Sequence, residues 1–131
     1  MGYFRNECLV ITGSIDAIHK AHKECKNIFS NLPTDCRIFI NPKSLISDVV
    51  PGVVNDCATF MIAVDGSKEG WLESDIIEEK RNLFMLWLRE QDDFYDWALV
   101  LLGGDDHECK ILRSNYGGDD NQGTNSSPVQ L

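Results

Sequence analysis

Short runs of apolar residues alternate along this chain with stretches in which apolar positions recur every three or four residues. Together these two patterns predict an order of strands and helices. Residues 7–12 and 59–64 are almost all apolar, which is typical of interior strands buried on both faces. Residues 97–102 and 109–112 flank a Gly-Gly-Asp-Asp turn at 103–106 and predict a further antiparallel pair.

Two stretches repeat their apolar positions every three or four residues and therefore predict amphipathic helices. The first begins at Ile15, with Ser14 as its N-cap, and ends before Pro33. Ser74 is the expected N-cap of the second helix, and acidic residues in its first turns suit the helix dipole. The apolar face of the second helix is expected to comprise Ile76, Ile77, Leu83, Phe84, Trp87 and Leu88.

The segment between the helices predicts a short strand at residues 37–40 and a hairpin of residues 45–50 and 57–64 around the turn 51–56. The resulting order is strand, helix, strand, strand, helix, strand, strand. We therefore expect an α+β fold in which two helices pack on one face of a mostly antiparallel sheet, in a ferredoxin-like (split βαβ) arrangement.

Length and composition suit one domain. We expect a single compact domain over residues 1–115 and a flexible C-terminal tail over residues 116–131, whose polar composition buries too little apolar surface to fold. The residues expected in the core are Leu9, Ile11, Ile18, Cys25, Phe60, Ile62, Phe84, Trp87 and Leu99.

The net charge of −9 is unevenly distributed. Residues 1–43 hold six Lys or Arg and four Asp or Glu, whereas residues 44–131 hold six and seventeen. The second part would be repelled by nucleic acid and by anionic membranes, and it would attract a basic protein surface. The partner expected is therefore a protein with a basic surface, although solubility alone would also explain the charge.

The five cysteines are an odd number and contain no C-x-x-C pair, which disfavours a disulfide framework or a zinc ribbon. Cys8, Cys25 and Cys57 fall within apolar patterns and are expected to be buried. No export signal or membrane-spanning run is visible, so we expect the cytoplasm of a host cell.

Candidate catalytic and metal-binding groups are sparse. His22 and Cys25 have helical ligand spacing but lie on an apolar stripe without a third ligand nearby, so an edge-of-core histidine is the simpler interpretation. Neither Asp92-Asp93 nor Asp105-Asp106 has the alternating spacing of a calcium loop. We therefore expect no enzyme activity, no metal and no cofactor.

Two segments are candidates for binding. The junction formed by Gly66, Ser67, Lys68 and Gly70 precedes a helix N-terminus and would hold a small anionic, nucleotide-type signal, unless it is only a turn in which Trp71 plugs the core. The second candidate, the acid–aromatic segment at residues 92–96, is the stronger one for a partner interface. Aromatic anchors with a charged rim are typical of interfaces. The expected partner-binding residues are Asp92, Asp93, Phe94, Tyr95 and Asp96, assisted by Glu78, Glu79, Asp105 and Asp106.

The chain also resembles a family of small phage- and prophage-encoded proteins over roughly residues 5–113. The resemblance rests on the run Asp65-Gly66-Ser67-Lys68-Glu69-Gly70-Trp71, on Glu73-Ser74-Asp75 and on Phe84-x-x-Trp87-Leu88-Arg89. It implies a genomic setting and no catalytic residues. Because phage accessory proteins often act on host defence, we expect a non-enzymatic inhibitor of a host defence complex, a CRISPR- or restriction-type effector whose basic channel the acidic segment would occupy.

Overall fold

The computed structural model describes residues 4–32, 40–103 and 108–116 of the chain. Most of the expected strand at residues 37–40, the acidic pair Asp105-Asp106 and the C-terminal residues 117–131 lie outside the described residues. The elements in chain order are β1 (Glu7–Ser14), α1 (Ile15–Ser30), the short 3₁₀ helix η1 (Pro42–Leu45), β2 (Val50–Pro51), β3 (Cys57–Ile62), α2 (Leu72–Arg89), β4 (Tyr95–Leu101) and β5 (Lys110–Ser114).

The five strands form one antiparallel sheet in the order β2-β3-β1-β4-β5. The central strand β1 places Ile11 opposite Phe60 of β3 and opposite Trp97 of β4. The connection through α2 joins β3 to β4 across β1, and the connection through α1 joins β1 to β2 across β3, so both are split βαβ units; β5 adds an edge strand beyond β4. The predicted α+β fold is confirmed.

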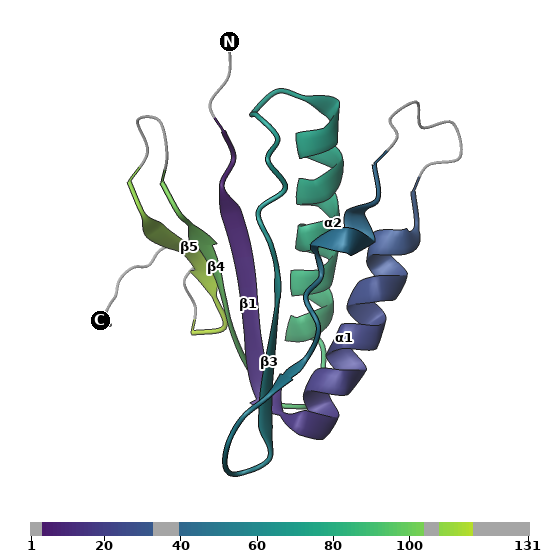
Figure 1. Cartoon of the computed structure of the whole chain (residues 1–131), viewed down its shortest axis with the longest axis vertical. Helices are drawn as coiled ribbons and strands as arrows, with labels where there is room; N and C mark the ends of the chain where they lie inside the picture. The colour runs from purple at the N-terminus through teal and green to yellow at the C-terminus, as the bar shows by residue number, and fades with distance from the viewer. Residues whose placement is uncertain (1–3, 33–39, 104–107, 117–131) are drawn as a thin grey trace.

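Both helices cover the same face of the sheet (Figure 1), and the hydrophobic core lies between the two layers. Of the nine residues expected in the core, eight are buried. Trp87 is the exception: it is partly buried and stacks on Phe84, with ring centroids 5.9 Å apart. Among the described residues, neither helix combines the length and apolar character needed to span a bilayer.

The second helix begins earlier than Ser74, so the predicted cap is wrong. Trp71 occupies the N-cap position and its carbonyl accepts a hydrogen bond from the Asp75 amide, while Ser74 lies inside the helix and is fully buried. Gly70 has a φ of +90°, which allows the chain to turn into the helix sooner than the polar residues indicate. Consequently Trp71 is 49% exposed and does not plug the core, and Leu83 is also largely exposed.

The predicted hairpin is shorter than expected. Residues 42–45 form η1 instead of leading into a strand, and pairing with β3 is limited to Val50 and Pro51 of β2 and to an isolated bridge between Ile46 and Ile62. Proline at the start of η1 favours a helical turn there. Cys57, expected to be buried, is exposed at the beginning of β3.

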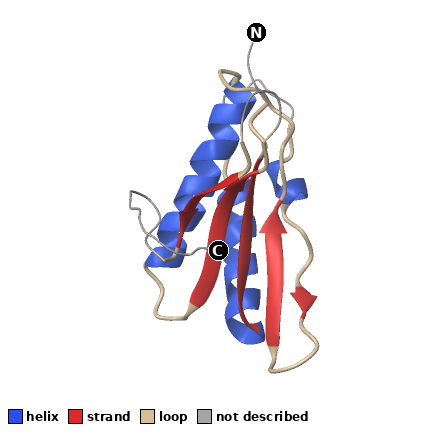
Figure 2. Ribbon diagram, turned by 90° about the vertical axis from the view of Figure 1, so that its left-hand side faces the viewer, coloured by secondary structure: helices blue, strands red, loops and turns tan. Residues whose placement is uncertain are grey.

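Contrary to the prediction, the two interior strands are only partly buried on the face opposite the helices, where Cys8 is the buried exception in β1. Val10 of β1 is 37% exposed and Met61 of β3 is 41% exposed, because both side chains lie on the face opposite the helices. Figure 2 looks onto this face, and no described element lies over the central strands. The described elements therefore leave apolar side chains of these two strands exposed.

A buried ion pair joins α2 to β1. Arg81 is 1% exposed, and its Nη2 group lies 3.1 Å from Oε1 of Glu7. Burial lowers the pKa of Arg81, and the Glu7 carboxylate opposes that shift. A second pair, Arg5 with Glu78 at 2.7 Å, lies closer to the surface. These pairs fix the start of β1 against the middle of α2.

Candidate protein-binding surface

The connection between α2 and β4 exposes an aromatic ring beside carboxylates. Asp92 and Phe94 are exposed, with Phe94 at 70%. An aromatic side chain that remains exposed in an otherwise well-packed domain loses the stabilisation that burial would provide. Phe94 is therefore available as an anchor for a partner.

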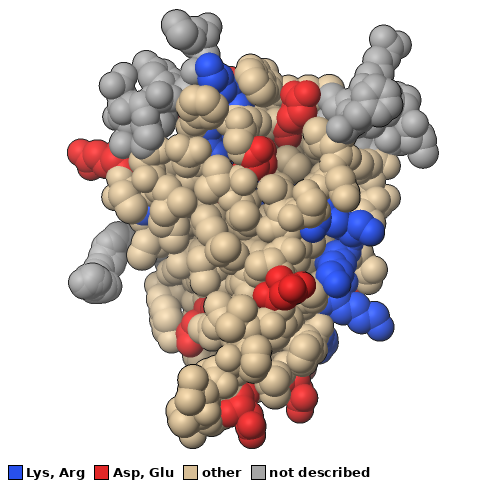
Figure 3. Space-filling model, viewed as in Figure 1, with Lys and Arg blue, Asp and Glu red and all other residues tan. Residues whose placement is uncertain are grey.

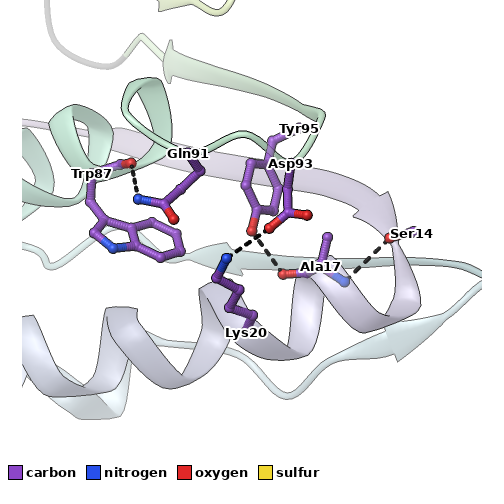
Figure 4. A network of polar contacts seen from close by, with 7 residues as sticks. All are labelled: Ser14, Ala17, Lys20, Trp87, Gln91, Asp93 and Tyr95. Atoms are coloured by element: carbon purple, nitrogen blue, oxygen red, sulfur yellow. Dashed lines mark hydrogen bonds and ion pairs between the residues drawn. The ribbon is translucent and has the colours of Figure 1, made fainter.

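Three contacts hold this connection against the rest of the molecule (Figure 4). Lys20 Nζ lies 2.9 Å from Oδ2 of Asp93, and the Gln91 side chain donates a hydrogen bond to the Trp87 carbonyl at 3.1 Å. The Tyr95 hydroxyl donates to the carbonyl of Ala17 in α1 at 3.1 Å. Phe94 therefore projects from a segment held on both sides, which reduces the ordering cost of binding through it.

Tyr95 does not belong to the exposed surface on which it was expected. Its side chain is buried, and it lies in the core with its hydroxyl bonded to α1. Burial, with a further contribution from Asp93, raises the pKa of Tyr95 to about 12. The alternation of β4 explains this placement, because Tyr95, Trp97 and Leu99 all lie on the helix-covered face.

The other expected partner-binding residues do not gather around Phe94. Asp96 accepts hydrogen bonds from Tyr116 at 2.8 Å and Asn115 at 3.3 Å, beside β5. Glu78 pairs with Arg5, and Glu79 is exposed in the same turn of α2. That turn lies roughly 15 Å from the helix C-terminus, at 1.5 Å per residue. The seven of these nine residues that the structure describes therefore do not form one surface, and Asp105 and Asp106 lie outside the described residues.

The structure instead brings residues from two other segments, the start of α1 and the turn between β2 and β3, next to Phe94. The end of β1 lies between β3 and β4: the Ile15 amide donates to the Asp56 carbonyl at 2.7 Å, and Gly13 pairs with Tyr95. Because neighbouring strands lie about 4.8 Å apart, the backbones of Asp56 and Phe94 are roughly 10 Å apart. Figure 1 shows these segments meeting at the lower end of the molecule. We call this surface the acidic tip and define it by Asp16, Val53, Val54, Asp56, Asp92, Asp93 and Phe94.

Val53 and Val54 belong to the acidic tip but were not expected from the sequence. They lie in the turn between β2 and β3, where Val53 is fully exposed. Two consecutive valines in a turn rich in Gly, Asn and Asp are unusual, because turns favour polar and flexible residues. These two valines were the feature of the sequence that could have indicated a binding site in this turn. Only the order of strands in the sheet places the turn beside Phe94.

Basic side chains are concentrated on one side of the molecule. Figure 3 shows a row of Lys and Arg side chains along the side where Figure 1 places α1, whereas Asp and Glu side chains lie at the lower end and also at the upper end and left edge of this view. The exposed lysines on α1 are Lys20, Lys23 and Lys26, and four aspartates belong to the acidic tip. The tip therefore attracts basic surfaces even though one side of the domain is cationic.

The alternative ligand junction is poorly arranged for an anion. A cavity of about 330 Å³ beside Gly66 and Ser67 has the acidic residues Asp65 and Glu73 in its lining. Lys68 lies over the Phe4 ring, 4.9 Å from its centroid, and is not among the described lining residues. Ser67 is buried and its hydroxyl donates to Asp65 at 2.7 Å. These carboxylates oppose the negative ligand that the sequence suggested.

The histidine and cysteine candidates have structural environments. His22 Nε2 lies 2.9 Å from the Ser47 carbonyl, and its ring packs edge-on against Phe60. Burial raises the pKa of the Cys25 thiol, which makes it a poorer nucleophile. Within the described part of the chain, no three His, Cys, Asp or Glu side chains are placed to share a metal ion.

Comparison of the chain with protein-family models, with curated proteins and with solved structures finds no match.

Proposed function

We propose that this chain is a non-catalytic phage- or prophage-type accessory protein that binds and inhibits a host defence complex of the CRISPR or restriction type. The acidic tip would dock on the basic, nucleic-acid-binding groove of such an effector. The resemblance to phage-encoded proteins supplies the biological setting, and the charge and shape of the tip supply the mode of binding.

The observation that carries the proposal is the exposed Phe94 ring among carboxylates on a braced connection. Interfaces obtain most of their binding free energy from a few buried aromatic anchors surrounded by a polar rim. Phe94 has the exposure and the fixed backbone of such an anchor. Val53 and Val54 extend the apolar area beside it.

The mechanism begins with electrostatic steering. The aspartates of the acidic tip attract a basic groove over roughly one Debye length, about 8 Å at physiological ionic strength. Burial of Phe94 then slows dissociation, and the tip competes with nucleic acid for the same cationic residues. Binding through this route weakens as salt concentration rises, because part of the attraction is between exposed charges.

A sequestered anionic signal is the alternative function. The acidic residues Asp65 and Glu73 in the lining of the cavity disfavour it, so the tip is the better-supported site.

The test is quantitative recovery of host proteins on the tagged full-length chain, followed by affinity measurement with the purified partner. Phe94→Ala should weaken binding about 30-fold, equivalent to about 2 kcal/mol for an anchor residue. Asp92→Lys should weaken binding several-fold, with a larger effect in low salt.

Two variants at the other end of the molecule serve as matched controls. Trp71→Ala removes an exposed aromatic ring at the start of α2, and Glu108→Lys makes the same change of charge as Asp92→Lys. Both should leave affinity unchanged. A partner whose affinity is insensitive to Phe94→Ala and Asp92→Lys, or a bound anion retained through purification, would contradict the proposal.

A further inference from the structure

The sheet face opposite the helices is apolar and uncovered by any described element. Its side chains come from all three central strands and from the edge strand β5, so they form one continuous surface. We call it the open face, and its apolar members are Cys8, Val10, Met61, Ala98, Val100 and Ile111.

This composition differs from that of a sheet face made for water. Antiparallel sheets with one solvated face alternate apolar and polar residues along each strand. Here β1 remains apolar at both faces, and Val10, Met61 and Ile111 are 37%, 41% and 64% exposed. An exposed apolar surface of this continuity is typical of an interaction site.

The polar groups of the open face are already paired. Thr59 donates to the Thr12 hydroxyl at 3.0 Å, and Thr12 donates to the Ala58 carbonyl at 2.9 Å. Asp96 is bonded to Tyr116 and Asn115. The open face therefore presents no unpaired charge to a partner, although the chain as a whole has a net charge of −9.

We propose that the open face binds a second copy of this chain, forming a two-fold symmetric dimer with the two sheets packed face to face. A basic partner would gain little here, because Asp96, the one acidic side chain that the described strands place on this face, is already hydrogen-bonded. An identical uncharged face is complementary in polarity, and a two-fold contact closes without further growth. Val10, on the central strand, would lie near the symmetry axis, with the sheets about 10 Å apart.

The size of the open face indicates a weak dimer. Four strands, each about 4.8 Å wide, and about seven residues at 3.4 Å give a footprint of roughly 450 Å² per copy. Two such footprints, about 900 Å² in total, fall below the roughly 1,200 Å² of stable interfaces and match weak, transient ones, so the dimer should form in a concentration-dependent manner. The C-terminal residues 117–131 are a poorer occupant, because their only apolar side chains are Pro128, Val129 and Leu131.

The test is sedimentation of the full-length chain over a range of concentrations at low and high salt. We expect a monomer–dimer equilibrium that shifts toward dimer in high salt, because salt screens repulsion between two acidic chains. Val10→Glu should weaken association at least tenfold, and Ile111→Glu, at a more exposed edge position, should also weaken it. Leu86→Glu makes the same change at an exposed position of α2, on the other face of the sheet, and should leave association unchanged; thermal unfolding checks that each variant is folded.

A chain that stays monomeric at every concentration and salt level would overturn the proposal. A dimer unaffected by Val10→Glu and Ile111→Glu would also overturn it, because association would then use another surface. If removal of residues 117–131 converts a monomer into a dimer, the chain's own C-terminal segment is the occupant. If Val10→Glu abolishes recovery of a host protein without changing sedimentation, that host protein is the occupant of the open face. Either of these two results would overturn the proposal that a second copy of the chain binds there.

Discussion

The ion pair between Arg81 and Glu7 should be a major determinant of stability, and Glu7→Gln is the change that isolates it. This substitution keeps the size of the side chain and removes its charge. Arg81 would then remain a 1%-exposed cation without its carboxylate, and its Nε and Nη1 groups already have no hydrogen-bond partner among the described residues. Breaking a buried pair from one side costs about 3–5 kcal/mol.

The partial exposure of Glu7 places the expected loss at the lower end of that range. Its side chain is 15% exposed, so water screens part of the interaction, and we expect the free energy of unfolding to fall by about 3 kcal/mol. For a domain of this size, that corresponds to a fall in melting temperature of roughly 12 °C. Calorimetry and urea unfolding at neutral pH measure both quantities.

Glu78→Gln is the matched control, since it makes the same chemical change in the Arg5 pair. The Glu78 side chain is 45% exposed, so its loss should cost less than about 1 kcal/mol. Replacing both buried partners, as Glu7→Leu with Arg81→Met, should restore stability to within about 1 kcal/mol of the original chain. Equal effects of the two carboxylate changes, or a double variant less stable than Glu7→Gln, would refute the reasoning.

Two further predictions concern the core and the brace of the acidic tip. Phe84→Ala should lower the free energy of unfolding by about 3–5 kcal/mol in urea titrations, because the Phe84 ring is fully buried. Phe94→Ala should change the same free energy by less than about 0.5 kcal/mol. Comparable losses in the two variants would contradict the assignment of Phe94 to the surface. Because the folded state raises the pKa of Tyr95 to about 12, against about 10 when unfolded, this tyrosine favours folding below pH 10 and loses that contribution as pH rises toward 12. The urea midpoint of Tyr95→Phe should therefore decline less steeply over that interval, and parallel pH profiles of the two proteins would show that Tyr95 is not responsible.

The order of elements followed from periodicity alone. A run of apolar residues such as 59–64 and a three-to-four spacing such as that from Ile15 to Phe29 reflect local geometry, so strand and helix were predictable without neighbours. The antiparallel ferredoxin-like order also followed, because a strand–helix–strand–strand–helix–strand succession leaves few unstrained topologies.

Helix ends and exposure were less predictable. Ser74 has the preferred cap chemistry, but the turn at Gly70 starts α2 at Leu72 and carries Ser74 into the interior. Tyr95 is the more polar of two adjacent aromatic residues, yet it is buried while Phe94 is exposed, because Tyr95 starts β4 on its helix-covered face.

The sequence by itself determined the α+β class, most of the core and the acidic character of the chain, because these depend on local periodicity and on composition. Tertiary structure decided which residues share a surface. Pairing of β1 with both β3 and β4 places Asp56 near Phe94, and α1 supplies Lys20 and Ala17 to hold the connection between them. Such contacts join residues about 40 to 80 positions apart, and their geometry depends on strand register and helix packing, which no local pattern of residues encodes.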